Sequence, residues 1–340
     1  MNQTFVKSVT EQLPQLGLLQ DEPMKKHTTF RIGGPADYYA EPDMSQISKL
    51  IEMAKACDMP VTVIGNGSNL LVGDKGIRGL VIGIGKGLSE IEVTEAVAQQ
   101  STAQDFTAQD NGHIITAGAG AILAAVAAKA AEASLSGLEF ASGIPGSVGG
   151  AVVMNAGAYG GEIKDVLIDA TVLTAEGELK TVTRDELDLS YRHSLVPEKG
   201  YIVLSARFRL TPKPKDEIKS YMAELRAKRV EKQPLEYPSA GSTFKRPEGY
   251  FAGKLIMDAG LRGYSVGDAQ VSQKHCGFVV NKGEATAADV LTLIKDVQET
   301  VLKQFGVNKR GFFPLLSERM YSFACRYMSL CAISSFTTSP

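Results

Sequence analysis

Two polar side chains in this 340-residue sequence are candidates for chemistry, Arg192 in the run YRHS and Ser242 in the run GSTF. A guanidinium stays charged and grips carboxylates with two parallel hydrogen bonds, so Arg192 could hold an acidic ligand. From the sequence alone, an ordinary surface arginine is the better explanation. Ser242 has no GxSxG elbow and no evident Asp/His activator, which argues against a hydrolase nucleophile and favours a turn or capping serine.

Three basic residues lie near Ser242 or in the same part of the chain. Lys245 and Arg246 follow it directly and could meet phosphates, although a solvated basic pair is equally consistent with their positions. His275 stands at the start of a predicted strand. A lone histidine there is more often a structural hydrogen-bonding residue than a ligand.

The densest glycine run of the chain spans residues 137–162, GLEFASGIPGSVGGAVVMNAGAYGGE. Glycines at this density let backbone approach backbone or ligand closely, and free N–H groups in such loops form anion-binding concavities. A flexible linker is the alternative, but linkers are polar and serine-rich. Because this run contains Leu138, Phe140, Ile144 and Val148, its composition favours a buried ligand site.

Another glycine-rich loop, at residues 65–69, lies earlier in the chain and follows a predicted strand at residues 61–64. The run Gly-Asn-Gly-Ser-Asn offers adjacent N–H donors and no charge, which suits a pyrophosphate held by backbone amides. It is neither a GxGxxG dinucleotide fingerprint nor a Walker motif. Alone, a tight turn explains it equally well; beside another glycine-rich loop, the phosphate interpretation gains weight.

Predicted strands and helices alternate around these loops, and Pro212 to Pro214 marks a domain boundary. We expect a helix and a loop over residues 1–26 and a surface loop over 95–112. The pattern indicates an α+β or α/β chain in about three lobes. Further predicted elements are a helix at 43–57, a hairpin at 166–182, a strand at 201–210, and helices at 216–232, 251–259 and 285–305.

Composition sets outer limits on function. The net charge of −2 argues against binding nucleic acid or a membrane surface through bulk charge. No apolar run reaches the ~18 residues of a membrane span, and the N-terminus lacks signal-peptide features. The four cysteines have no metal-ligand spacing, so we expect no metal site, free thiols and a cytoplasmic location.

Taken together, these stretches resemble the UDP-N-acetylenolpyruvoylglucosamine reductase (MurB) family in its shorter branch. The resemblance covers roughly residues 25–307 in order. The matching runs are TTFRIGGPA (28–36), IGNGSNLLV (64–72), GLEFASGIPGSVGGAVVMNAGAYGGEI (137–163), YRHS (191–194), GSTFKRP (241–247), GKLIMDAGLRG (253–263) and VSQKHCGFVVNKGEATAADV (271–290).

The resemblance implies an α+β fold with four segments. Residues 1–26 form an N-terminal helix and loop. An FAD-binding domain of the vanillyl-alcohol-oxidase (PCMH) type, with two sub-lobes, follows at 27–211. An α/β substrate-binding lobe occupies 212–307, and 308–340 is an atypical tail.

It also implies residue roles. Arg192 would steady negative charge that develops on the substrate, and Ser242 would deliver a proton. Substrate-binding residues would be Lys245, Arg246 and His275. The residues expected to bind the cofactor are Gly65, Asn66, Gly67, Ser68 and Asn69 at the pyrophosphate, and Glu139, Gly143, Ile144, Gly146, Gly149, Gly150 and Asn155 along the isoalloxazine and ribityl chain.

The implied reaction is ping-pong: NADPH reduces FAD, and reduced FAD passes hydride to the enolpyruvyl ether of a UDP-sugar, giving a peptidoglycan precursor. The partners would be these small molecules, with no nucleic acid. Two rival interpretations are another flavoprotein oxidase on the same module and an FAD-binding protein without full turnover. The oligomeric state is left open.

The sequence departs from the family after Val307. There the family continues with a segment of the form xLExEVR, whose glutamate is the third catalytic residue. Here Asn308-Lys309-Arg310 follows, and no carboxylate appears before Glu318, which does not match the motif. We therefore predict impaired reduction of the enolpyruvyl substrate. A one-base shift of reading frame near Lys309 would restore a Glu-Val pair, and we hypothesise that the tail records such a slip.

Overall fold

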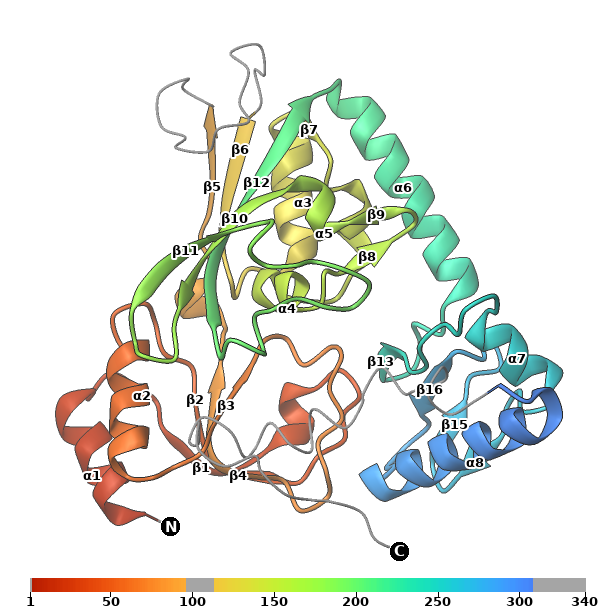
Figure 1. Ribbon diagram of the computed structural model, residues 1–340, viewed down its shortest axis with the longest axis horizontal. Helices are drawn as coiled ribbons and strands as arrows, with labels where there is room; N and C mark the ends of the chain where they lie inside the picture. Colours follow the sequence, from red (N-terminus) through yellow and green to blue (C-terminus); the bar gives the residue numbers. More distant parts are fainter. Residues whose placement is uncertain (1, 96–112, 308–340) are drawn as a thin grey trace, which may run out of the picture.

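The computed structural model describes residues 2–95 and 113–307 (Figure 1). Most of the surface loop predicted at 95–112, and all of the tail at 308–340, lie outside the described residues. Within them the chain forms three larger β-sheets and one two-stranded hairpin, with helices packed on the sheets. The combination of one partly parallel sheet with antiparallel sheets confirms the predicted α+β class.

The first sheet has the strand order β1-β2-β4-β3, with β2, β4 and β3 parallel and β1 antiparallel at the edge. Helix α2 buries Ile47, Leu50, Ile51 and Ala54, the spacing of one helix face. The segment expected to be a loop before residue 26 contains strand β1. The elements are α1 (Gln3–Gln12), β1 (Leu19–Pro23), η1 (Met24–His27), β2 (Pro35–Ala40), α2 (Ile47–Ala56), β3 (Val61–Ile64) and β4 (Ile77–Gly83).

The second sheet is antiparallel and has the order β11-β10-β12-β6-β5, with the short β7 paired to β12. Its central strand β12 alternates buried and partly exposed residues from Leu204 to Leu210, as expected for a sheet with one face in the core. Its strands are β5 (Ile91–Glu95), β6 (His113–Gly118), β7 (Leu135–Ser136), β10 (Leu167–Leu173), β11 (Leu179–Thr183) and β12 (Ile202–Pro212).

Helices and short turns cover the inner face of this sheet. They are η2 (Lys86–Leu88), α3 (Leu123–Glu132), η3 (Glu139–Gly143), α4 (Val148–Val153), the hairpin β8 (Gly157–Ala158) and β9 (Gly161–Glu162), and α5 (Ile163–Val166). The glycine-rich stretch predicted to form a ligand site supplies η3, α4 and the β8–β9 hairpin.

Helix α6 (Lys215–Lys232) leads from the second sheet to the third, which has the order β13-β16-β15-β14 (Figure 1). Its start is held by Lys215 and Lys219, which both pair with Glu132 of α3. The remaining elements are β13 (Ser239–Ser242), α7 (Ala252–Asp258), β14 (Ser265–Val266), β15 (Ala269–Val271), β16 (Phe278–Asn281) and α8 (Ala287–Phe305).

The lobe formed by the third sheet and its helices packs on the lobe formed by the first sheet. Phe30 and Ile32, fully or nearly fully buried, belong to the same hydrophobic core as Phe244. Asp74 accepts hydrogen bonds from the backbone N–H groups of Ala287 (2.7 Å) and Ala288 (3.0 Å). A carboxylate at a helix N-terminus satisfies free N–H donors and interacts favourably with the helix dipole, so Asp74 ties α8 to the first lobe.

Candidate active site

The two glycine-rich loops predicted from the sequence lie against each other. The first glycine loop (residues 65–69) follows β3. The second glycine loop, as the name is used below, is the part of the predicted run 137–162 at residues 143–150, from the end of η3 to the first turn of α4. Asn66 donates a hydrogen bond from Nδ2 to the carbonyl of Pro145 at 2.6 Å. A side chain on Gly146 would lie 3.5 Å from Ser68 Oγ. Two segments some 80 residues apart in the sequence therefore form one surface.

Two glycines of the first loop lie close to neighbouring loops, Gly65 to a side chain and Gly67 to backbone. A Cβ on Gly65 would lie 2.3 Å from Ser147 Oγ. Gly67 has φ of +60°, and a Cβ there would lie 2.0 Å from the carbonyl oxygen of His27. Both distances are far below van der Waals contact, so these glycines let the backbone approach the neighbouring loops closely.

Ser147 has a buried hydroxyl that no other described residue pairs with. The residue is 2% exposed, and within the described part of the chain its Oγ makes no hydrogen bond although the residue stands directly before α4. Buried polar atoms normally have partners, and an exception indicates an unseen ligand, water or ion. An orphan hydroxyl facing an uncharged glycine loop fits the phosphate or hydroxyl groups of a cofactor such as FAD.

The other glycines of the second loop have different neighbours. Gly149 donates its N–H to Ala119 O at 2.8 Å, and a Cβ there would lie 3.0 Å from Ala119 Cβ, so this glycine allows α4 to pack closely. Gly143 leaves room for Arg229, whose Cδ lies 3.0 Å from the position of a Cβ. Gly150 and Ile144 belong to the second glycine loop and Asn69 to the first, and the predicted cofactor contacts of all three stay predictions.

Glu139 is buried, and its carboxylate is hydrogen-bonded to residues of its own loop. Its carboxylate accepts hydrogen bonds from Ser136 Oγ (2.6 Å) and from the Gly137 N–H (2.7 Å). Gly137 has φ of +131°, a conformation that favours glycine. These bonds indicate that Glu139 shapes the entrance of the glycine-rich stretch; its predicted contact with the cofactor stays a prediction.

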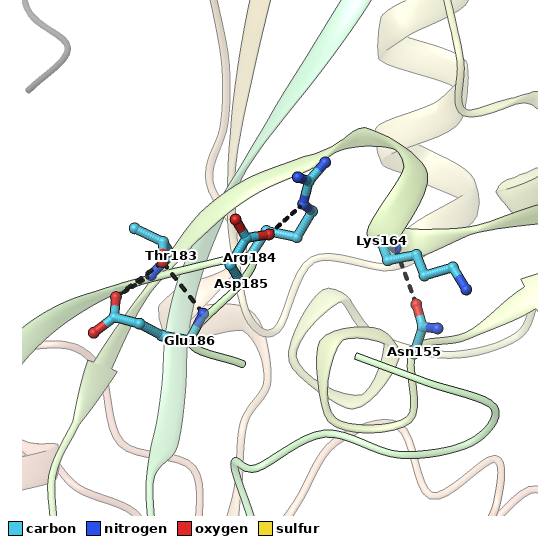
Figure 2. Close-up of polar contacts among 6 residues, drawn as sticks. All are labelled: Asn155, Lys164, Thr183, Arg184, Asp185 and Glu186. Atoms are coloured by element: carbon cyan, nitrogen blue, oxygen red, sulfur yellow. Dashed lines mark hydrogen bonds and ion pairs between the residues drawn. The ribbon is translucent and has the colours of Figure 1, made fainter. Parts of the chain in front are cut away.

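Asn155 is 2% exposed, and both ends of its amide are bonded to protein. Its Oδ1 accepts from the Lys164 N–H at 2.9 Å (Figure 2). Its Nδ2 donates to Glu162 Oε2 (2.8 Å) and to the Ser190 carbonyl (3.1 Å). The arrangement supports a role in fixing the loop that carries Arg192, and direct contact with the cofactor stays a prediction.

Arg192 is half-buried in that loop, with φ of +57°. Its only hydrogen bond among the described residues is a long one, 3.5 Å from Nη2 to the Gly157 carbonyl. No described carboxylate pairs with it. The guanidinium is therefore available for an acidic group.

Ser242 and His275 flank one backbone position, Gly277. A Cβ on Gly277 would lie 3.5 Å from Ser242 Oγ and 2.9 Å from His275 Cε1. His275 Nδ1 accepts a hydrogen bond from the Gly277 N–H at 3.1 Å, which requires an unprotonated Nδ1. Burial lowers the pKa of His275 below its ordinary value, in agreement with this neutral form.

Lys245 and Arg246 are exposed on the same lobe. The Arg246 guanidinium lies over the Phe251 ring, 4.6 Å from its centroid. No described contact joins either residue to Ser242, so their predicted substrate contacts stay predictions.

A cavity of about 300 Å³ lies where the second glycine loop meets the third lobe. Two of its lining residues, Arg229 and Gln233, were not predicted from the sequence. The many charged residues of α6 do not indicate which side chains at the end of the helix face the cavity. Other lining residues are Arg31, Pro145, Ser239, Gly241 and Phe278. In the described part of the chain, no cluster of three or more metal-ligating side chains occurs, and no helix is long and apolar enough to cross a membrane.

Two family models match the chain: "FAD binding domain" over residues 36–183, and "UDP-N-acetylenolpyruvoylglucosamine reductase, C-terminal domain" over residues 233–308. The reductase of that name from Agathobacter rectalis is 96% identical over 318 residues, covering 94% of this chain and 100% of the relative. The one from Lachnoclostridium phytofermentans is 51% identical over 303 residues, covering 88% and 93%. The solved structure of the reductase from Thermus caldophilus aligns with a TM-score of 0.66 and 38% identity, covering 84% of this chain and 94% of that one.

Proposed function

The chain belongs to the UDP-N-acetylenolpyruvoylglucosamine reductase family, and from that premise we propose how its residues work. The enzyme is an oxidoreductase that uses NADPH and FAD to reduce the enolpyruvyl ether of a UDP-amino sugar, a step of peptidoglycan precursor synthesis. The observation that carries the proposal is the pair of facing glycine loops around the orphan hydroxyl of Ser147. Bound FAD would supply the hydride chemistry.

The two glycine loops hold the cofactor through uncharged groups. The first loop offers backbone N–H groups for the pyrophosphate, and Ser147 Oγ is a further hydrogen-bonding group beside Gly65. No covalent bond to the protein is required by this arrangement. The domain limits of 27–211 for cofactor and 212–307 for substrate are part of the proposal, supported by the break in sheet topology at α6.

Arg192 binds the carboxylate of the enolpyruvyl group. Its guanidinium lacks an ion-pair partner among the described residues, and Asn155 fixes its loop through the Ser190 carbonyl. When hydride adds to the vinyl CH₂ carbon, negative charge builds toward that carboxylate. A preorganised cation at this point stabilises the transition state more than the ground state.

Ser242 delivers a proton to the carbon next to the carboxylate. A serine hydroxyl is a weak acid, so it serves by position and needs a route for proton resupply. Its place beside Gly277 puts it on the lobe that faces the second glycine loop across the cavity. Lys245, Arg246 and His275 bind other parts of the substrate.

We also propose that this particular chain turns over slowly. The match to the C-terminal domain model ends at residue 308, directly after Val307, which supports a departure from the family at this point. Without the family glutamate, the charge partner of Arg192 in the second half-reaction is missing. The cofactor loops, remote from the tail in sequence, keep their residues. A cytoplasmic location and the absence of a nucleic-acid partner complete the proposal.

Product analysis tests the function against its rivals. Under nitrogen, the protein with NADPH and UDP-N-acetylenolpyruvoylglucosamine should form the reduced UDP-sugar and NADP⁺ in equal amounts, however slowly. Rapid oxygen consumption without sugar reduction would favour the oxidase. Bound FAD with no product, even after the family C-terminal segment replaces residues 308–340, would favour a binding protein without turnover.

A further inference from the structure

Arg229 is a partly buried cation that has no counterion among the described residues. It lies in the last turn of α6, beside Gly143 of the second glycine loop. Its Cδ and Nη1 lie 3.0 and 3.3 Å from the position of a Cβ on Gly143. Among the described residues the guanidinium makes no hydrogen bond or ion pair, and burial lowers its pKa. Partial burial of a cation is costly unless a ligand pairs with it.

Gln233, one helical turn further on, presents the complementary orphan. Its Oε1 is buried and has no hydrogen-bond partner in the part of the chain that the structure describes. Side chains four residues apart lie on the same side of a helix end. Both residues line the cavity of about 300 Å³, together with Pro145 of the second glycine loop. The cavity is thus lined by a cation, Arg229, and by a glutamine whose Oε1 is unpaired among the described residues.

The Arg229 guanidinium and Gln233 Oε1 together restrict which ligand can satisfy both groups. A phosphate or carboxylate would satisfy Arg229 but would offer no donor to Gln233 Oε1. An imide edge, in which a carbonyl stands beside a ring N–H, satisfies both. Two rings in the proposed reaction have such an edge: the pyrimidine ring of the flavin and the uracil of the UDP-sugar.

We propose that Arg229 and Gln233 bind the pyrimidine edge of the FAD isoalloxazine, with Arg229 donating to the N1–C2=O side and Gln233 Oε1 accepting from N3–H. The flavin is favoured over uracil because Gly143 and Pro145 of the second glycine loop border the two side chains. This inference rests on the proposed function. It adds two cofactor-binding residues from α6, which the sequence predicted only as a charged helix.

The assignment gives Arg229 an electronic role. Reduced flavin carries negative charge at N1 and the C2 carbonyl, and protein charge near N1 tunes flavin chemistry. A guanidinium in a poorly solvated position favours that reduced form. Gln233 accepts the hydrogen bond from N3–H. It contributes to the affinity for FAD and changes the reduction equilibrium of the flavin little.

The test measures FAD affinity and the flavin midpoint potential in Arg229→Gln, Gln233→Leu and the matched control Arg226→Gln, an exposed arginine of the same helix. Arg229→Gln should shift the reduction equilibrium toward oxidised flavin by about tenfold, which is about 30 mV for a two-electron couple. Gln233→Leu should weaken FAD binding by about tenfold or more, as expected for a buried unpaired N–H. Arg226→Gln should change neither quantity.

Two further experiments distinguish binding of the flavin ring from binding of uracil. FAD methylated at N3 should bind the native protein more weakly than FAD, and Gln233→Leu should no longer distinguish the two. UDP serves as the uracil probe: its dissociation constant should be the same in the native and variant proteins. If the variants bind UDP more weakly while the FAD affinity and potential stay native, the proposal is overturned and the edge belongs to uracil.

Folding and function are checked separately. Far-UV circular dichroism and thermal unfolding show whether each variant folds, and Arg229→Lys, which keeps the charge, should retain more of the native potential than Arg229→Gln. Folded variants with native potential and native FAD affinity would contradict the inference. A native protein without FAD would instead contradict the proposed function.

Discussion

The amide of Asn155 donates a hydrogen bond at 3.1 Å to the backbone carbonyl of Ser190, two residues before Arg192. The bond links the end of the glycine-rich stretch to the loop that carries the proposed carboxylate-binding arginine. Asn155 and Arg192 both have positive φ, 39° and 57°. Such non-glycine conformations are costly and persist where the surrounding structure fixes them.

Asn155→Ala should therefore slow the second half-reaction, in which the enolpyruvyl sugar reoxidises the flavin. Displacement of a catalytic group by about 1 Å can cost about 100-fold in rate. Reduction of the flavin by NADPH should stay near native. Rapid mixing of each half-reaction measures both rates. Thr183→Ala, which removes the 3.0 Å bond from Thr183 Oγ1 to exposed Glu186 (Figure 2), is the control, and equal rates in the two variants would refute the link.

Ser242→Ala should also separate the half-reactions. Proton delivery by a positioned group contributes roughly 10²–10⁴-fold, and only the second half-reaction needs it. Stopped-flow traces should show native flavin bleaching by NADPH and slow recovery with the enolpyruvyl sugar. If bleaching and recovery slow by the same factor, Ser242 has a structural role.

Gly65→Ala should reduce FAD binding, because the new Cβ would meet Ser147 Oγ at 2.3 Å. The native protein should purify with about one FAD per chain and release all of it on acid treatment. Gly17→Ala is the control, since apart from its chain neighbours no atom of the described residues lies within 4 Å of a Cβ there. Flavin retained on the denatured native chain would favour the oxidase alternative, and full FAD content in Gly65→Ala would contradict the close approach of the loops.

His275 should make stability depend on pH. Its pKa is lowered in the folded state, so the unfolded chain binds more protons between that value and about 6.5. The contribution to stability is complete above about pH 6.5 and is lost as the pH falls toward the folded pKa. The melting temperature of His275→Gln should fall less between pH 7.5 and pH 5.5 than that of the native protein. Parallel melting curves across this range would show that His275 does not titrate as described.

The sequence predicted the two glycine loops because glycine density is a local signal. It also predicted helices such as α2 and α8, whose apolar spacing is regular. It did not predict that Ser147 has an orphan hydroxyl or that Asn155 is bonded to Ser190 and Glu162, because these depend on loops that are distant in sequence. Arg229 was missed for the same reason: burial of one arginine on a charged helix is decided by the partner surface, here Gly143.

Replacing residues 308–340 with the family ending that carries a glutamate should speed the second half-reaction. The glutamate would restore the charge partner of Arg192, while FAD content and the rate of reduction by NADPH should not change. The matched control is the same ending with glutamine in place of that glutamate. Equal reoxidation rates in all three proteins would show that the tail does not impair the site.

The central claim is that this chain carries hydride from NADPH to an enolpyruvyl sugar through FAD, and sequential mixing without oxygen tests it most directly. One equivalent of NADPH should bleach the flavin absorbance, and the bleached protein should persist until UDP-N-acetylenolpyruvoylglucosamine is added, when the absorbance returns. A protein that carries no flavin, that NADPH fails to bleach, or that stays bleached with the sugar even when the family ending is restored would contradict the account.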